Sequence, residues 1–386
     1  MKYIIILASG LSDVNFSPIG TSTPALDELA FKGQVGMITT IPRDENSSFG
    51  IAALSLLGYE ADDYTGRSAF EAICEKIDYS EKDTTLSMNL ISVTEDDDIG
   101  DRTMLSSDGW DVSAGDAARY IKVLQNALGN EQISFHSGYK HKNCLIVHNN
   151  TNVNSEFFSP SQIEGQTLGG FLPQGSDADF FIEIMDKAFD ILNNHAFNQE
   201  RAEEGLKPIN GIWLWGKGTK PHLKNFKEKF KLNGAIVSPS FYLQGVGINV
   251  GMDIINIPTI YTNQIPEYMV EAHSAIDALN NHDFVFLHVE TDKISEKETL
   301  NGITKLDNVV KYVKTKLAEQ GDEFCIAVLP NPYTQVKNKS KSGSIPFIVY
   351  NSVRPAMSKL KYLEPEATKG IYLSKGSSLI QYMLQS

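Results

Sequence analysis

Two lysines beside a glycine turn form the most distinctive chemical string in this sequence. Residues 212–221 read Ile-Trp-Leu-Trp-Gly-Lys-Gly-Thr-Lys-Pro, so an apolar stretch with two tryptophans runs into a Gly-Lys-Gly turn. Lys217 and Lys220 then lie near main-chain N–H groups that such a turn leaves open, a combination that suits an anion. Tryptophan packing followed by a plain glycine turn explains the same string, and both interpretations stay open.

Two further positions carry side chains that could bind a ligand. Arg67 follows the turn Tyr64-Thr65-Gly66 and suits a phosphate or a carboxylate, although an isolated arginine is more often a surface ion pair. His288 is followed by Glu290 and Asp292, which would suit a metal. No second histidine lies at the usual short spacing, which favours a strand-end histidine with satisfied nitrogens.

These side chains need elements that position them, and short, nearly continuous apolar runs supply the strands. Such runs are typical of a parallel sheet with both faces covered by helices. Apolar residues spaced three or four apart predict the covering helices. The predicted strands are 2–7, 284–288, 324–329 and 346–350, and the predicted helices are 180–192, 268–279 and 303–317.

Alternation of these strands and helices predicts an α/β fold with a mostly parallel sheet and helices on both faces. Ligands of such sheets bind beyond the carboxyl ends of the strands, so the loop 8–13 after the first strand is a candidate wall of a site. The glycine of this loop, Gly10, equally suits a tight turn. The loop carries neither a GxGxxG nor a P-loop motif, which argues against dinucleotide and P-loop functions.

The middle of the chain has a different composition, richer in Asn, Ser, Asp and Gly. We therefore predict a smaller α+β domain at 81–207, inserted into a larger domain made of 1–80 and 208–386. The acidic run 95–98 lies in this part. It lacks the glycine and the spacing of a calcium loop, so we expect a solvated loop there.

Composition excludes several classes of function. The 386 residues are 41% hydrophobic and 21% charged, as expected for a globular protein with a full core. A net charge of −14 has the wrong sign for a nucleic-acid binder, and no apolar run approaches the length of a membrane span. The three cysteines form no CxxC pair, so we expect a reduced, cytoplasmic protein.

Several strings follow one another along nearly the whole chain: 1–7, 23–33, 54–59, 64–67, 212–218, 234–237, 245–252 and 283–290. In this order they resemble the archaeal-type cofactor-independent (2,3-bisphosphoglycerate-independent) phosphoglycerate mutases of the alkaline phosphatase superfamily. The resemblance implies the α/β sheet domain with an inserted domain. It also implies two divalent metal ions, manganese or zinc, and a serine that transfers phosphate.

At the metal and nucleophile positions of that family, this sequence has other residues. Phe49 stands at the position of the nucleophile. Ser9, Asn331, Pro332 and Ser340 stand at positions of metal ligands, and Asp292 is the one possible survivor. We therefore expect no catalytic residue of the family's kind, no bound metal and no other cofactor. We also expect Ser9, Phe49, Asp292, Asn331 and Ser340 to gather around one cleft between the two domains.

The substrate side of the resemblance is better preserved. Arg67, Arg201, Lys217 and Lys220 lie in strings that match the family and imply a site for a phosphorylated metabolite. We expect a phosphoglycerate-mutase-like protein without the two-metal phosphoserine chemistry, whose partner is a small phosphorylated metabolite, bound weakly, or another protein. Two alternatives stay open: an active mutase of glycolysis that converts 3-phosphoglycerate to 2-phosphoglycerate, and a homoserine-kinase-like phosphotransferase.

Overall fold

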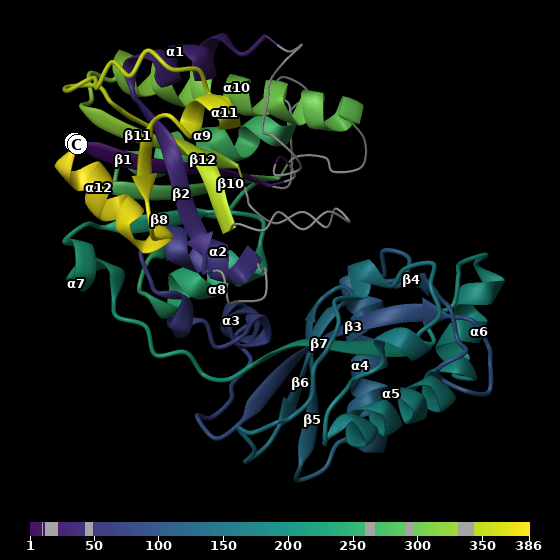
Figure 1. Cartoon of the computed structure of the whole chain (residues 1–386). Helices are drawn as coiled ribbons and strands as arrows, with labels where there is room; N and C mark the ends of the chain where they lie inside the picture. Colours follow the sequence, from purple (N-terminus) through teal and green to yellow (C-terminus); the bar gives the residue numbers. More distant parts are fainter. Residues whose placement is uncertain (10, 12–21, 43–48, 259–266, 291–295, 331–342) are drawn as a thin grey trace. The chain divides into compact units, whose positions relative to one another are not determined.

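The computed structural model describes the chain except for residues 10, 12–21, 43–48, 259–266, 291–295 and 331–342 (Figure 1). The chain forms two compact units: unit 1 contains Met1–Tyr64 and His222–Ser386, and unit 2 contains Thr65–Pro221. The predicted insertion, 81–207, lies inside unit 2. This unit also takes in α3 (Arg67–Cys74) and the whole of β7 (Gly211–Gly218), because both pack on β3 (Thr84–Val93).

Unit 1 is built on an eight-stranded sheet in the order β13-β2-β12-β11-β1-β10-β8-β9. Only β12 runs antiparallel to its neighbours; all other pairs are parallel. The strands are β1 (Lys2–Ser9), β2 (Gln34–Ile41), β8 (Gly234–Val237), β9 (Asp253–Ile254), β10 (Phe284–Glu290), β11 (Phe324–Pro330), β12 (Gly343–Asn351) and β13 (Ile371–Leu373). All four predicted strands are confirmed.

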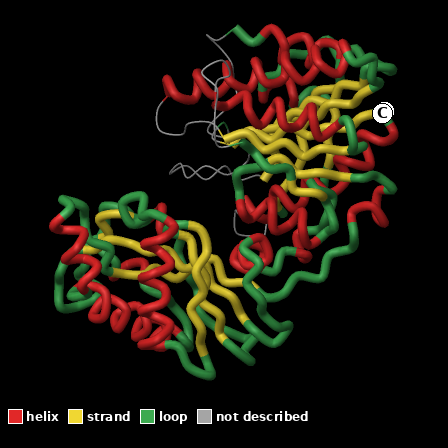
Figure 2. Tube along the Cα trace, turned by 180° about the vertical axis from the view of Figure 1, so that it is seen from behind, coloured by secondary structure: helices red, strands yellow, loops and turns green. Residues whose placement is uncertain are grey.

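Helices cover both faces of this sheet, as Figures 1 and 2 show. One face packs against α1 (Pro24–Lys32), α9 (Val270–Leu279), α10 (Glu296–Glu319) and α11 (Glu364–Ala367). On the other side lie α2 (Phe49–Leu56), α8 (Phe241–Asn249) and α12 (Leu379–Gln385). A short helix, α7 (Phe226–Phe230), and the 3-10 turns Ala61–Asp63, Glu267–Met269 and Gly376–Ser378 complete the unit. The predicted α/β class is therefore confirmed.

Continuous burial explains the apolar strands at the centre of the sheet. From Ile4 to Ser9 every residue of β1 is buried, and β11 is buried along its whole length. Alternate residues of β1 face opposite helix layers: Ile4, Ile6 and Ala8 pack on the layer of α1, α9 and α10. A strand covered on both faces has no polar side, which is why its sequence shows no alternation.

Unit 2 is an antiparallel sheet in the order β4-β3-β6-β5, with β7 paired to β3. Its remaining strands are β4 (Met104–Ser106), β5 (Ile133–Tyr139) and β6 (Lys142–Val147). Residues of α4 (Ala114–Leu128) and α5 (Ala178–Asn193) share one apolar core with the sheet, and those of α3 pack on its other face. The unit also contains α6 (Ala196–Glu203) and the 3-10 turns Pro160–Gln162 and Gly169–Phe171.

Two smaller expectations also bear on function. The acidic run 95–98 is fully exposed between β3 and β4, which confirms the solvated loop. Across the part of the chain that the structure describes, no helix is long and apolar enough to cross a membrane.

Candidate functional site

Ser9 and His288 meet at the carboxyl end of the unit 1 sheet. They come from β1 and β10, which are neighbouring parallel strands with Leu7 opposite His288 and Ser9 opposite Glu290. The Oγ of Ser9 lies 2.6 Å from Nε2 of His288, and the two residues are 5% and 2% exposed. The resemblance places a metal-binding carboxylate at Ser9, so a neutral hydroxyl bound to an imidazole stands there instead.

The second ring nitrogen of His288 also has a hydroxyl partner. Its Nδ1 lies 3.0 Å from Oγ of Ser238, which directly follows β8 and itself accepts the main-chain N–H of Ser240. A neutral imidazole has one N–H donor and one acceptor nitrogen, and a hydroxyl can serve either. Both nitrogens therefore have a hydroxyl partner, as expected of a strand-end histidine.

Phe49 lies against the same imidazole. It is the first residue of α2, and its ring centroid is 5.5 Å from that of His288 and 6.0 Å from that of Tyr242. The hydroxyl of Tyr242 donates to the carbonyl oxygen of Gly50 at 2.8 Å, which holds the tyrosine beside the start of α2. An aromatic ring thus occupies the position where the resemblance implies a phosphate-accepting serine.

The described residues of this centre do not fit two divalent metal ions. Such ions need several carboxylate, imidazole or thiolate ligands in fixed geometry. Within the described parts of the chain, no group of three or more His, Cys, Asp or Glu side chains could hold a metal ion. The predicted positions Asp292, Asn331, Pro332 and Ser340 lie outside the described residues.

Ser9 and Phe49 are therefore the two predicted positions that the structure brings together here. The expected cleft of five positions stays a prediction. Sequence reasoning missed Ser238 and Tyr242 as parts of this centre. The only signal for Ser238 was its place just after an apolar run, at the edge of the sheet where parallel strands end.

In unit 2, Arg67 lies at the start of α3 and contacts an acidic and an aromatic side chain. Its Nε lies 2.6 Å from Oε1 of Glu71, one helical turn further on, and its guanidinium lies 5.2 Å from the ring centroid of Trp215. The other oxygen of Glu71 accepts the hydroxyl of Ser87 at 2.6 Å. The side chain of Arg67 is 25% exposed, so it combines an internal ion pair with partial access to solvent.

A glycine permits this arrangement. Gly66 has a φ of +114°, and a Cβ on it would lie 1.9 Å from the carbonyl oxygen of Lys217. Only glycine fits such a close approach of two main chains. The start of α3 is therefore pressed against the end of β7, which brings Arg67 next to Trp215.

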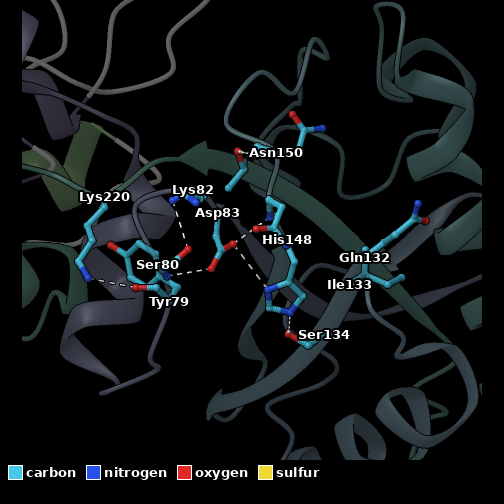
Figure 3. Close-up of polar contacts among 12 residues, drawn as sticks. Tyr79, Ser80, Lys82, Asp83, Gln132, Ile133, Ser134, His148, Asn150 and Lys220 are labelled. Carbon is cyan, nitrogen blue, oxygen red and sulfur yellow. Dashed lines mark hydrogen bonds and ion pairs between the residues drawn. The ribbon is translucent and has the colours of Figure 1, made fainter.

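The other three predicted cations donate to main-chain carbonyls. Nζ of Lys217 lies 2.8 Å from the oxygen of Val153 and 3.1 Å from that of Ser155. Nζ of Lys220 lies 3.1 Å from the oxygen of Tyr79 (Figure 3). Nε of Arg201, a residue that is 8% exposed, lies 2.8 Å from the oxygen of Lys207.

The four cations do not form one cluster in the structure. Arg67, Lys217 and Lys220 lie near the carboxyl end of β7, whereas Arg201 is bound to a residue that precedes the amino end of that strand. Their role in binding a ligand stays a prediction. Sequence reasoning missed Glu71, although its spacing of four from Arg67 is the spacing of helical ion pairs.

The described structure is thus a mostly parallel α/β protein with an antiparallel insertion. At the carboxyl end of its parallel strands, buried Ser9 and His288 lie beside the half-buried ring of Phe49. A sequence model of the family described as "2,3-bisphosphoglycerate-independent phosphoglycerate mutase" matches residues 30–198. The mutase of that name from Methanosarcina barkeri is 30% identical, with 100% of each chain covered. A probable mutase of the same kind from Geobacter sulfurreducens is 29% identical, again with 100% of each chain covered.

Solved structures agree on the fold. The PH0037 protein from Pyrococcus horikoshii is similar with a TM-score of 0.72 at 21% identity, covering 100% of this chain and 96% of that one. The cofactor-independent phosphoglycerate mutase from Thermoplasma acidophilum gives a TM-score of 0.60 at 21% identity, with 100% and 99% covered. This chain belongs to the 2,3-bisphosphoglycerate-independent phosphoglycerate mutase family, which confirms the resemblance found in the sequence.

Proposed function

We propose that this family member lacks the two-metal phosphoserine chemistry that the resemblance implies for active mutases. The observation that supports the proposal best is the buried contact of Ser9 with His288, covered by the ring of Phe49. A phenylalanine has no atom that can accept a phosphoryl group. In a metal centre of this kind the ions supply the charge that activates the nucleophile and stabilises the transferred group.

The same contact argues against a metal at Ser9 on energetic grounds. A neutral hydroxyl is a poor ligand compared with a carboxylate, because it brings no charge to offset the cost of dehydrating a divalent ion. Metal binding at His288 would also break one of its two hydrogen bonds to serine. Both effects favour the hydrogen-bonded, metal-free arrangement.

We further propose that Arg67 is the centre of a weak site for a phosphorylated metabolite. Its guanidinium contacts Glu71 and Trp215, and its side chain is 25% exposed, so solvent and small anions can reach it. Arginine is suited to phosphate because it offers several N–H donors in one plane. The carboxylate of Glu71 competes with any bound anion, so we expect a Kd on the order of 1 mM, equivalent to about −4 kcal/mol.

An active mutase is the second candidate. It is favoured by the 30% identity to a relative named as a phosphoglycerate mutase over the whole of both chains. Phosphate transfer to another acceptor, such as homoserine, would still need the metals, so the same objection applies to it.

The experiment follows the conversion of 3-phosphoglycerate to 2-phosphoglycerate by the full chain with added manganese. We expect no conversion above the rate without protein, and no phosphate bound covalently to the protein. Isothermal titration with 3-phosphoglycerate then tests the anion site: binding should be lost in Arg67→Ala and kept in Arg354→Ala, a change at an exposed arginine of unit 1. Turnover would contradict the first proposal, and equal binding by both variants would contradict the second.

A further inference from the structure

Unit 2 contains a cavity of about 550 Å³ beside the end of the β5–β6 pair and the start of α5. Its lining residues include three that carry side-chain amides, Gln132, Asn149 and Asn150. It shares no residue with the contacts of Arg67 or with the Ser9–His288 centre. None of its lining residues is a lysine or an arginine, and all of them are described.

A buried carboxylate organises one wall of the cavity. Asp83, which is 5% exposed, accepts the N–H of Asn149 at 3.0 Å and that of Ser80 at 2.8 Å. Its Oδ1 also lies 3.7 Å from Nδ1 of His148 (Figure 3). These contacts hold the turn at Asn149, whose φ is +53°, so this part of the cavity is formed before any ligand binds.

His148 is fixed from its other side as well. Oγ of Ser134 lies 2.8 Å from Nε2 of His148 and 2.7 Å from Nε2 of His136. Figure 3 shows the His148 ring between Asp83 and Ser134. Nε2 is therefore hydrogen-bonded and Nδ1 faces Asp83, so His148 offers the cavity an ordered ring.

A second part of the lining, next to the start of α5, carries one carboxylate. Asp177 lies just before α5 and accepts the N–H of Asn154 at 2.8 Å and the hydroxyl of Ser176 at 3.2 Å. The positive end of the helix dipole offsets only part of its negative charge. One turn further on, Phe180 lines the cavity and makes an edge-to-face contact with Phe181 at 5.1 Å.

We propose that this cavity binds an uncharged, polyhydroxylated small molecule of the size of a sugar. Amide groups donate and accept hydrogen bonds, as hydroxyl groups do, and the phenylalanine ring suits the apolar C–H face of a sugar ring. The volume lies within the range of small-molecule sites. Free phosphates are disfavoured, because the cavity offers a carboxylate and no cation.

The test uses the full chain with isotope-labelled histidine, and NMR follows the His148 ring, whose signal is assigned by its loss in His148→Gln. D-glucose and D-ribose are the probes, and inorganic phosphate is the charged comparison. We expect a saturable shift of the His148 signal with at least one sugar. Gln132→Ala should weaken it about fivefold through the loss of one hydrogen bond, and Gln199→Ala, an exposed glutamine of α6 outside the cavity, should leave it unchanged.

Three results would overturn the proposal: no shift with either sugar, a larger shift with phosphate than with the sugars, or equal affinities in the two glutamine variants. The measurement reads binding in unit 2 and needs neither turnover nor metal. Its failure would therefore leave the proposed function untouched, and turnover in the mutase assay would leave this site untouched.

Discussion

Replacement of Ser9 by alanine tests whether the hydrogen bond between Ser9 and His288 stabilises unit 1. Ser9 is 5% exposed and His288 is 2% exposed. The change removes the hydroxyl of Ser9 and leaves Nε2 of His288 without this hydrogen-bond partner. A buried polar atom that loses its partner costs about 1–3 kcal/mol. We therefore expect the free energy of unfolding of unit 1 to fall by about 2 kcal/mol.

In a domain of this size, each kcal/mol of lost unfolding free energy lowers the melting temperature by roughly 2–4 °C. Ser9→Ala should therefore lower the melting temperature by roughly 4–8 °C. Differential scanning calorimetry measures the shift, and Ser22→Ala, at an exposed serine before α1, serves as the matched control. A Ser9→Ala protein as stable as the control would refute the reasoning, because the bond to His288 would then contribute nothing.

Three further outcomes follow from the contacts described above. Phe49→Ser restores a hydroxyl at the nucleophile position but no metal ligand, so a mutase assay should still show no turnover; measurable activity would contradict this. Burial and the nearby His148 lower the pKa of His136 in the folded protein. As the pH falls below about 6.5, the unfolded state therefore binds a proton at this histidine before the folded state does, and unit 2 should lose stability. Urea unfolding at several pH values should show a smaller loss in His136→Gln. Lys217→Met leaves two carbonyl oxygens without their donor and should destabilise unit 2 by about 1–3 kcal/mol in urea unfolding, whereas Lys231→Met, at an exposed lysine, should not.

The central strands of unit 1 were predictable because burial on both faces requires nearly continuous apolar runs in the sequence. The predicted strand 2–7 lies within β1 (Lys2–Ser9), and the predicted helix 303–317 lies within α10 (Glu296–Glu319). Short elements gave no such signal. The two-residue strand β9 is set by pairing with β8, which depends on tertiary structure and not on local hydrophobicity.

The candidate site was predictable only in part. Comparison with family motifs singled out Ser9 and Phe49 as substituted positions. The contact of Ser9 with His288, however, depends on the register of β1 against β10, strands that are some 280 residues apart in sequence. The contact of Phe49 depends on the packing of α2 beside β10. Ser238 could not be found from spacing, since a lone serine after a short strand is common. The partners of Lys217 are main-chain carbonyls of a distant loop, and main-chain acceptors leave no trace in the sequence.

Metal content of the purified full chain tests the central claim most directly. The protein is incubated with manganese and zinc, dialysed, and analysed by elemental mass spectrometry, with Ser9→Asp measured in parallel as the variant that returns a carboxylate to the centre. The account predicts well under one metal ion per wild-type chain. Two ions per wild-type chain after dialysis would contradict it.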